Sequence, residues 1–438
     1  MYRIVTLAIL VTLCLPAAPL NARQWTDSSG VFTIEAELLD VTGYSVRLRK
    51  PDGQVVTVPL DRLSAADRDY ARSAGARGQA AAKPALPTRE DAIRQKLQQP
   101  TKFGFIGTPL CQVLEFLSDQ HDVNIQIDRR ALDDSGIATD TPVTAPSQQG
   151  ELGTTFGAVL DSLKLAWIIK HDVLLVTTKD AAEQDVPFRV YKLLRPLRIE
   201  DLIADLMRNI APESWDAVGG PGSVMALPPS VLVISQTQAN HRQIEKHYGD
   251  LMTPVRSPVP AKSPGLMSDS VAAALEKLTR IEFIETPLTQ VVDFLRDRNK
   301  LEIKVDENSL ADVGIALDVP ITMKVKDVRL GSALSLLLAP LDLTWRAGQS
   351  GIQIMTPEAE ASQLQLVFYR VDDLLANSQA DHLIEAITST VAPSTWDEVG
   401  GPGSIHLGVR GTLDVRQTFA VHRQVAQLLA DLRQAAQK

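Results

Sequence analysis

The sequence predicts an α+β protein of several small domains: a small β-barrel followed by tandem duplicated α+β sandwich modules. The chain has 438 residues, and at roughly 100 to 200 residues per domain this length predicts more than one domain. Near the N-terminus, apolar and polar residues alternate with period two, which is typical of a half-buried sheet. A longer unit that mixes strand-like and helix-like segments then occurs twice.

The first 22 residues have the pattern of an export signal. Arg3 gives a positive start, residues 4–15 form an apolar run too short to span a bilayer comfortably, and residues 20–22 offer a cleavage context. No later stretch reaches about eighteen apolar residues. We therefore expect an exported protein, periplasmic or associated with the cell envelope, without a membrane span after signal removal. An uncleaved anchor is the alternative.

Composition narrows the class of partner. The formal net charge is -9, whereas a nucleic-acid binder needs a basic surface to neutralise phosphates. We therefore do not expect nucleic acid as a partner. Cleavage of the signal would leave Cys111 as the single thiol. Hydrophobic cores rather than disulfides would then hold the exported chain together.

Residues 24–72 form a candidate β domain of about fifty residues, the size of a minimal barrel. Phe32, Ile34, Ala36 and Leu38 alternate with polar neighbours. Residues 44–48 and 55–58 continue the pattern on either side of a turn at 51–53, which predicts a hairpin. Ser64 is placed to cap a short helix, with Asp67 in its first turn.

This segment resembles the first SLA homology domain. The resemblance rests on Trp25-Thr26-Asp27 with Gly30, on residues 35–38, on Asp52-Gly53, and on residues 58–64. It implies a barrel of the Src-homology-three type that binds short peptides. In its eukaryotic setting the family is associated with adaptor function and with cytoskeletal-protein, ubiquitin and identical-protein binding; in an exported protein those particular partners should be absent.

A linker at 73–90 leads to the duplicated unit. Matching residues recur at an offset of 178, including Phe105 and Phe283, and Tyr191 and Tyr369. Three residues are gained near Asp372, after which the offset becomes 181. Residues 211–223 and 392–404 then share ten identities in thirteen positions. The predicted modules are 91–180 and 186–250 in the first copy and 270–357 and 364–434 in the second, with a Pro-rich linker at 251–269 between the copies.

Each copy divides into two halves. In the first half, Leu110, Val113, Leu114 and Leu117 follow the spacing of a helix buried on one face. A strand at 123–127, a second helix from Leu152 and a hairpin at 167–177 complete a β-α-β-β-α-β-like sandwich. The second half predicts a strand at 188–193, a helix at 200–210, a strand at 231–235 and a helix from about Gln238.

The first halves resemble the short secretin and TonB-receptor N-terminal domain. The matching residues are Phe105, Pro109-Leu110, residues 125–128 and residues 152–163, with Phe283, Pro287-Leu288, residues 303–306 and residues 330–341 in the second copy. The second halves are similar to the KH-like ring-building domain of secretins at 232–243 and 413–424, although the loop at 215–223 departs from that pattern. No barrel-forming region follows, so we do not expect an outer-membrane pore.

The residues that could carry catalysis are few. His241 and His422 correspond between the copies, but neither has a supporting set of metal ligands or triad partners, and helix-surface or capping roles are expected. Asp128 with Asp140, and Asp306 with Asp318, could act as paired carboxylates, but each follows a strand, where Asp commonly satisfies turn amides. We therefore expect no catalytic residues, no metal and no cofactor.

The loops around Trp215 and Trp396 are the candidate partner-binding sites. Each indole stands in a Pro/Gly-rich loop beside an aspartate, Asp216 or Asp397, with no periodic pattern to bury it. The indole could anchor the loop onto its own domain, or it could be an exposed binding platform. Because ten of thirteen residues agree between the copies, we assign partner binding to Trp215, Asp216, Trp396 and Asp397.

The predicted function is non-catalytic: a protein-binding adaptor or scaffold of the bacterial cell envelope, with a protein or peptide partner and no nucleic acid. One alternative is an envelope hydrolase of wall polymers that uses Asp128, Asp140, Asp306 and Asp318. The other alternative is an accessory subunit of a secretion or transport assembly, because the ring-building resemblance implies self-association.

Overall fold

The computed structural model describes residues 23–28, 30, 32–42, 45–50, 54–71, 88–257, 264–375, 379–409 and 411–436. The predicted export signal, the hairpin turn at 51–53 and most of the first linker lie outside these residues. The chain divides into two compact units, residues 1–86 and 87–438. No helix in the described ranges combines the length and the apolar character that crossing a membrane requires.

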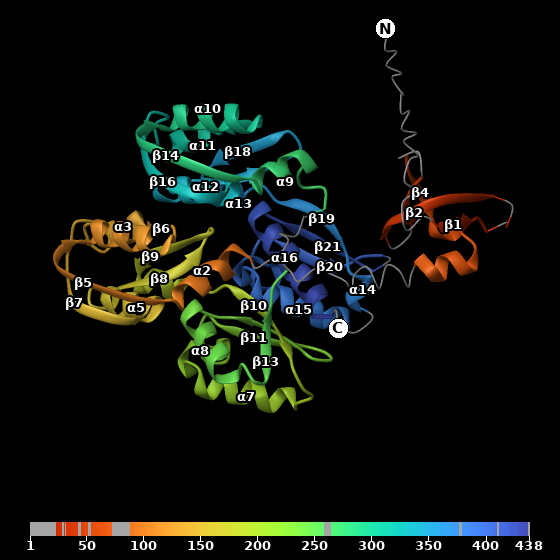
Figure 1. The fold of residues 1–438 in the computed structure, drawn as a ribbon, viewed down its shortest axis with the longest axis horizontal. Helices are drawn as coiled ribbons and strands as arrows, with labels where there is room; N and C mark the ends of the chain where they lie inside the picture. The colour runs from red at the N-terminus through yellow and green to blue at the C-terminus, as the bar shows by residue number, and fades with distance from the viewer. Residues whose placement is uncertain are drawn as a thin grey trace, which may run out of the picture. The chain divides into compact units, whose positions relative to one another are not determined.

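The N-terminal unit contains a four-stranded antiparallel sheet in the order β1-β2-β3-β4 (Figure 1). Its strands are β1 (Arg23–Thr26), β2 (Thr33–Thr42), β3 (Ser45–Arg49) and β4 (Val55–Pro59), followed by the 3₁₀ turn η1 (Leu60–Arg62) and a helix at 65–71. A single bridge between Asp27 and Leu63 joins the start of the sheet to its end. Among the described residues, the sheet is therefore an open one rather than the closed barrel that its size suggests.

The predicted helix cap at Ser64 is confirmed. Ser64 Oγ accepts a hydrogen bond from the Asp67 backbone N–H at 3.2 Å. The Asp67 carboxylate in turn accepts from the Thr26 N–H at 2.8 Å and from Arg23 at 2.7 Å. One buried carboxylate thus fixes the helix to the first strand, beside the buried indole of Trp25.

The larger unit begins with a module that has two sheets rather than the single sheet expected. Its two-stranded sheet pairs β5 with β7, and its three-stranded sheet has the order β6-β9-β8. The elements in chain order are α2 (Arg89–Leu97), β5 (Pro100–Pro109), α3 (Leu110–His121), β6 (Ile125–Ile127), α4 (Arg129–Asp134), β7 (Pro142–Glu151), α5 (Leu152–Asp161), β8 (Leu165–Lys170), β9 (Val173–Thr178) and α6 (Lys179–Gln184). Helices α3 and α5 carry apolar side chains that pack with both sheets in one core.

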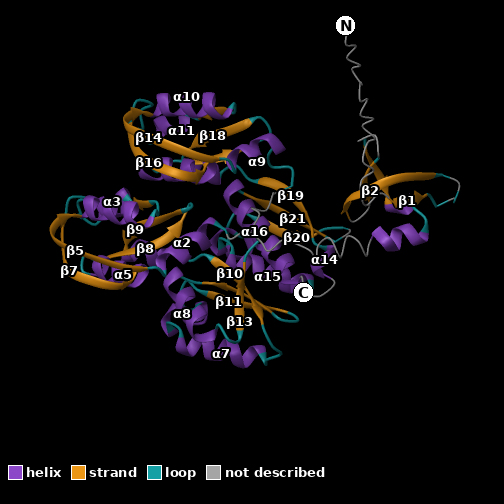
Figure 2. Ribbon diagram, in the orientation of Figure 1, coloured by secondary structure: helices purple, strands orange, loops and turns teal. Residues whose placement is uncertain are grey.

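The second copy repeats this order of elements. They are α9 (Asp269–Leu275), β14 (Leu278–Pro287), α10 (Leu288–Asn299), β15 (Glu302–Val305), α11 (Glu307–Asp312), β16 (Pro320–Arg329), α12 (Leu330–Leu338), β17 (Thr344–Ala347), β18 (Gly351–Met355) and α13 (Pro357–Ala361). Their sheets are β14-β16 and β15-β18-β17, the counterparts of those in the first copy (Figure 2).

The second halves each form a sheet with helices on one face. In the first copy the elements are β10 (Phe188–Leu193), α7 (Ile199–Asn209), β11 (Ser223–Leu227), β12 (Val231–Ser235), α8 (Gln238–Tyr248) and β13 (Met252–Val255). In the second copy they are β19 (Gln365–Arg370), α14 (Asp372–Leu375), α15 (Ala380–Thr390), β20 (Ser404–Leu407), β21 (Thr412–Gln417) and α16 (Phe419–Ala436). The sequence expectations for β10 and β12 agree with the structure residue for residue.

The two second halves differ at one edge. In the first copy the sheet order is β11-β12-β10-β13, whereas the second copy has β20-β21-β19. Strand β13 falls within the segment predicted as a Pro-rich linker. At the corresponding place in the second copy, helix α16 simply continues to Ala436.

Helices of the second copy cover the sheet of the first. Helix α15 packs on β11 and β12, and α16 packs on β10 and β13. Ser223 Oγ on β11 donates a hydrogen bond to the carbonyl of Ser389 on α15 at 2.9 Å. The apolar residues Val190 and Val233 of this sheet therefore join the core of the second copy.

Candidate functional site

Both candidate tryptophans are buried core residues. Trp215 is 0% exposed and Trp396 is 1% exposed. Each indole N–H donates to a carbonyl just beyond the preceding helix, Ile210 at 2.8 Å and Val391 at 2.7 Å. A buried indole with its N–H already hydrogen-bonded cannot serve as an exposed platform, so the assignment of Trp215 and Trp396 to partner binding is corrected to an anchoring role.

The loop folds tightly around its indole. The Gly222 N–H donates to the Ser214 carbonyl at 2.8 Å, and the Gln236 side chain donates to Ser214 Oγ at 2.6 Å. A Cβ added at Gly222 would lie 2.1 Å from Gln236 Nε2. In the second copy, Gly403 and Gln417 take the same places.

This geometry explains why the loop sequences agree so well between the copies. Gly219 and Gly400 have φ angles of 89° and 86°, which favour glycine. Close backbone packing therefore accounts for the glycines that the sequence interpretation attributed to a partner. Only the loop tips remain available for contact: Asp216 and Asp397 are exposed, and so are Val218 and Val399.

The two corresponding histidines are buried, in contrast to the helix-surface or capping role expected. The ring nitrogens of His241 lie 2.9 Å from the Tyr191 hydroxyl and 2.9 Å from the Pro187 carbonyl. His422 has the same partners, the Tyr369 hydroxyl at 3.0 Å and the Gln365 carbonyl at 2.9 Å. Burial lowers the pKa of both histidines. The recurrence of Tyr191 and Tyr369 was the sequence signal for this pair.

Two of the four candidate carboxylates act in helix caps. Asp128 accepts hydrogen bonds from the Ala131 N–H at 3.2 Å and from the Thr177 hydroxyl at 2.9 Å. Asp306 accepts from the Ser309 N–H at 3.3 Å. Their roles as N-caps of α4 and α11 agree with the expected turn chemistry. The other two candidates, Asp140 and Asp318, are exposed.

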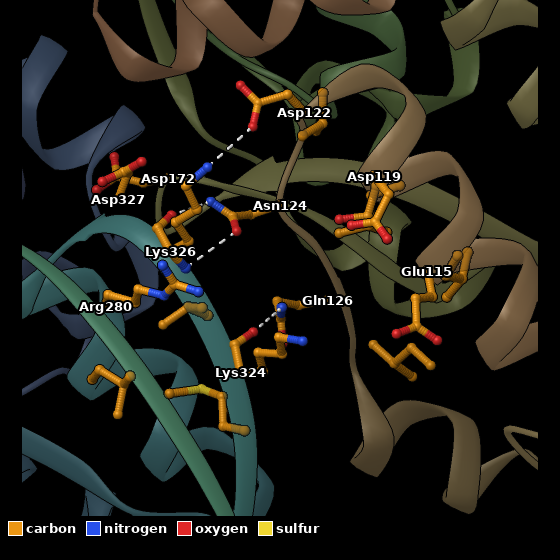
Figure 3. Close-up of a pocket in the computed structure, with 18 of the residues that line it drawn as sticks. Glu115, Asp119, Asp122, Asn124, Gln126, Asp172, Arg280, Lys324, Lys326 and Asp327 are labelled. Carbon is orange, nitrogen blue, oxygen red and sulfur yellow. Dashed lines mark hydrogen bonds and ion pairs between the residues drawn. The ribbon is translucent and has the colours of Figure 1, made fainter.

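A cleft of about 1190 Å³ separates the first copy from the second. One wall comes from α3 and β6, and the other from β14 and β16 (Figure 3). Two side-chain amides connect the walls. Gln126 Nε2 donates to the Lys324 carbonyl at 2.9 Å, and Asn124 Oδ1 accepts from the Lys326 N–H at 3.3 Å.

The charges of this cleft are balanced and partly paired. Asp122 lies 3.0 Å from Lys96 and 3.6 Å from Lys326, and the hydrogen bond and charge of Lys96 lower the pKa of the Asp122 carboxyl. Six acidic residues line the cleft together with six basic ones: Glu115, Asp119, Asp122, Asp172, Glu282 and Asp327, with Arg89, Lys96, Arg129, Arg280, Lys324 and Lys326. Such a lining does not favour ligands of either charge, and the described residues contain no cluster of three metal-ligating side chains. The cleft is best described as a polar seam between the copies.

Sequence reasoning missed a set of exposed apolar residues that recur in both copies. Ile106 and Ile284 occupy equivalent exposed positions, as do Phe116 and Phe294. Each phenylalanine packs edge-on against a neighbouring ring, Phe105 in the first copy at a centroid distance of 5.6 Å. Their recurrence at the offset of 178 was the available signal.

Comparison with known proteins assigns the N-terminal segment. Residues 16–77 match the model of SLA1 homology domain 1, SHD1, which confirms the resemblance inferred from residues 24–72. A stretch of 50 residues, 11% of this chain, is 40% identical to the actin cytoskeleton-regulatory complex protein SLA1 of Mycosarcoma maydis. The match spans only 4% of that protein's length.

Two solved structures are distantly similar to the chain. The GspC-GspD complex of the type II secretion system of enterotoxigenic Escherichia coli is 15% identical and matches 35% of this chain and 98% of that chain, with a TM-score of 0.14. XcpQN012 is 13% identical and matches 46% of this chain and 80% of that chain, with a TM-score of 0.15.

Proposed function

We propose that this chain is a non-catalytic protein-binding adaptor or scaffold of the bacterial cell envelope. The SHD1 segment at 16–77 supports a binding role, because the relative that carries it is by its name part of a cytoskeleton-regulatory complex. In the proposal, this segment with its four-stranded sheet binds a short peptide of the partner. The duplicated modules that follow it in the sequence form the body of the scaffold, and the export signal directs the chain to the envelope.

One observation carries the proposal. Four of the side chains that could do chemistry are engaged in structure: Asp128 and Asp306 cap helices, and His241 and His422 are buried with both ring nitrogens hydrogen-bonded. Large apolar side chains, by contrast, are exposed at equivalent places in both copies, namely Ile106, Phe116, Val218, Ile284, Phe294 and Val399. Exposed apolar residues that recur in this way are typical of contact surfaces rather than of catalytic centres.

In-cell crosslinking tests the proposal. A photoreactive amino acid placed at Ile106 or Ile284 should give a discrete crosslinked product in the envelope fraction, whereas the same residue at exposed Asp140 should not. Purified protein should leave wall polymers intact. Hydrolysis of wall polymers that is lost in Asp128→Asn would instead establish the hydrolase alternative.

A further inference from the structure

The two copies differ in how they finish the edge of one sheet. In the first copy, β13 pairs antiparallel with the outer edge of β10, with Val190 opposite Val255 and Lys192 opposite Thr253. Its counterpart β19 pairs with β21, and no other described strand lies along it. The first copy thus shows what kind of structure completes this edge: a short antiparallel strand.

The backbone of β19 is oriented to receive such a strand. The Val371 N–H donates to the Gly411 carbonyl at 2.9 Å, so the odd-numbered residues of β19 hydrogen-bond to β21. Because hydrogen-bonding direction alternates along a strand, the N–H and C=O groups of Leu366 and Phe368 point to the outer edge. In the first copy the even-numbered set faces the β13 side: the Leu194 N–H donates to the Leu251 carbonyl at 2.9 Å, whereas the Leu193 N–H donates to Ser230 on the β12 side at 2.8 Å.

The side chains on this stretch are apolar and exposed. Leu366 is 57% exposed and Phe368 is 54% exposed. Val190, the counterpart of Phe368, is 0% exposed because helix α16 covers that face of the first sheet. Proteins commonly protect sheet edges with charged residues. Strand β15, also at an edge, follows that rule with Glu302 and Lys304, which form an ion pair at 3.0 Å. Strand β19 carries a charged residue only at its end, Arg370.

The available stretch has a defined end. On the C-terminal side, Arg433 of α16 donates to the Arg370 carbonyl at 2.6 Å and contacts Asp373 at 2.7 Å. Helix α16 therefore engages the end of the edge, and the open positions are centred on Leu366 and Phe368.

We propose that β19 is a strand-addition site for an extended segment of a partner protein. The inference rests on the proposed function, since it names the place and the chemistry of one protein contact. The register of β13 on β10 specifies the segment: antiparallel to β19, with an apolar residue opposite Phe368 and a polar one opposite Arg370, as Thr253 stands opposite Lys192. A second apolar residue is expected opposite Leu366, because it would cover that exposed side chain. Read from its N-terminus, the segment is polar-x-apolar-x-apolar.

Peptide selection on residues 23–438 provides the test, with a phage library of random nonapeptides as the probe. Selected sequences should show the alternating apolar pattern. Their synthetic peptides should bind at least tenfold more weakly to Phe368→Lys or Leu366→Lys, and with unchanged affinity to the control Val313→Lys, at a valine of the second copy that is 52% exposed. Failure to enrich any peptide, or equal binding to Phe368→Lys, would overturn the site.

Backbone modification separates strand addition from other modes of docking. N-methylation of the peptide residues whose N–H groups face β19 should abolish binding, while methylation at the alternate positions should leave it intact. Equal effects at both sets would contradict strand addition. A concentration-dependent dimer of the chain that Phe368→Lys dissociates would make a second copy the occupant and overturn the partner-peptide proposal. These negative results would leave the crosslinking experiment at Ile106 and Ile284 unaffected, and that experiment tests the proposed function separately.

Discussion

Asp431 is a buried carboxylate at the junction of the two copies. Its Oδ1 accepts hydrogen bonds from the Ser257 N–H at 2.6 Å and from Gln427 at 2.9 Å. Burial raises the pKa of Asp431 to about 6. The folded protein therefore holds this proton more tightly than the unfolded chain does, and the ionised form opposes folding at neutral pH.

We expect Asp431→Asn to stabilise the protein at pH 7. Asn keeps the acceptor oxygen and removes the buried charge, so the free energy of unfolding should rise by about 2 kcal/mol. Wild-type stability from this group is present below the unfolded pKa of 3.8 and is lost as pH rises through about 6. Urea unfolding between pH 4 and 7 measures the difference, which should shrink toward pH 4. Asp250→Asn, at the exposed equivalent position, should have no effect.

Trp396 anchors its loop to the end of α15, and its removal should destabilise the second copy. Trp396→Ala leaves a large cavity and an unpaired Val391 carbonyl, so we expect a loss of about 3 to 5 kcal/mol. Urea unfolding should show this loss, whereas exposed Val399→Ala should change stability little. An unfolding free energy close to wild type, with weakened partner binding, would restore the interface interpretation of this loop.

At the scale of elements, the caps of α4 and α11 distinguish the scaffold from the hydrolase. Asp128→Ala removes an N-cap and should cost about 1 kcal/mol in urea unfolding, while Asp128→Asn, an equally good cap, should be nearly neutral. A catalytic Asp128 would be revealed by activity rather than by stability. Both variants would lose activity on wall polymers, and stability would not predict the loss.

The sequence predicts the strongly periodic elements well and the long-range ones poorly. Helix α3 and strands β10 and β12 follow from local apolar patterns. Strand β7 (Pro142–Glu151) was missed because its sequence is mostly polar and its pairing with β5 spans distant parts of the chain. Strand β13 contains Pro254. An edge strand tolerates proline, but in the sequence this residue favours the interpretation as a linker.

For the candidate site, local patterns were misleading where tertiary packing decides. Trp215 lies in a segment without period, yet it is buried because the loop closes over it through Ser214 and Gln236. His241 lies near a helix start, yet its ring is buried, because its two ring nitrogens hydrogen-bond to the Tyr191 hydroxyl and the Pro187 carbonyl. Neither partner is local in sequence, so no window of residues could have shown these contacts.

At the scale of the larger unit, a buried ion pair joins the first copy to the second. Asp172 in the β8–β9 turn accepts from Arg329 at 2.6 and 2.8 Å and from Ser332 at 2.9 Å. Burial alone would raise the pKa of Asp172, but the hydrogen bonds from Arg329 and Ser332 hold it below the usual value. The equivalent positions are Ser350 and Glu151. Ser350 and Glu151 cannot form the same ion pair, so the contact joins Asp172 of the first copy to Arg329 of the second and has no counterpart.

Breaking this pair should loosen the junction between the copies. Arg329→Ala leaves a buried carboxylate without its partner, and we expect a loss of about 3 to 5 kcal/mol. Small-angle scattering at neutral pH should show a larger radius of gyration. Arg280→Ala, an exposed arginine on the same cleft, should leave the dimensions unchanged, and an unaltered radius in Arg329→Ala would show that other contacts hold the copies together.

Backbone hydrogen exchange of residues 23–438, with and without a selected peptide, tests most directly whether the scaffold binds its partner through the open edge of β19. The account predicts strong protection of the Leu366 and Phe368 amides when the peptide is bound, because their N–H groups gain strand partners, and little change at the cleft residues Asn124 and Gln126. Unchanged exchange at Leu366 and Phe368 with new protection along the cleft would contradict it.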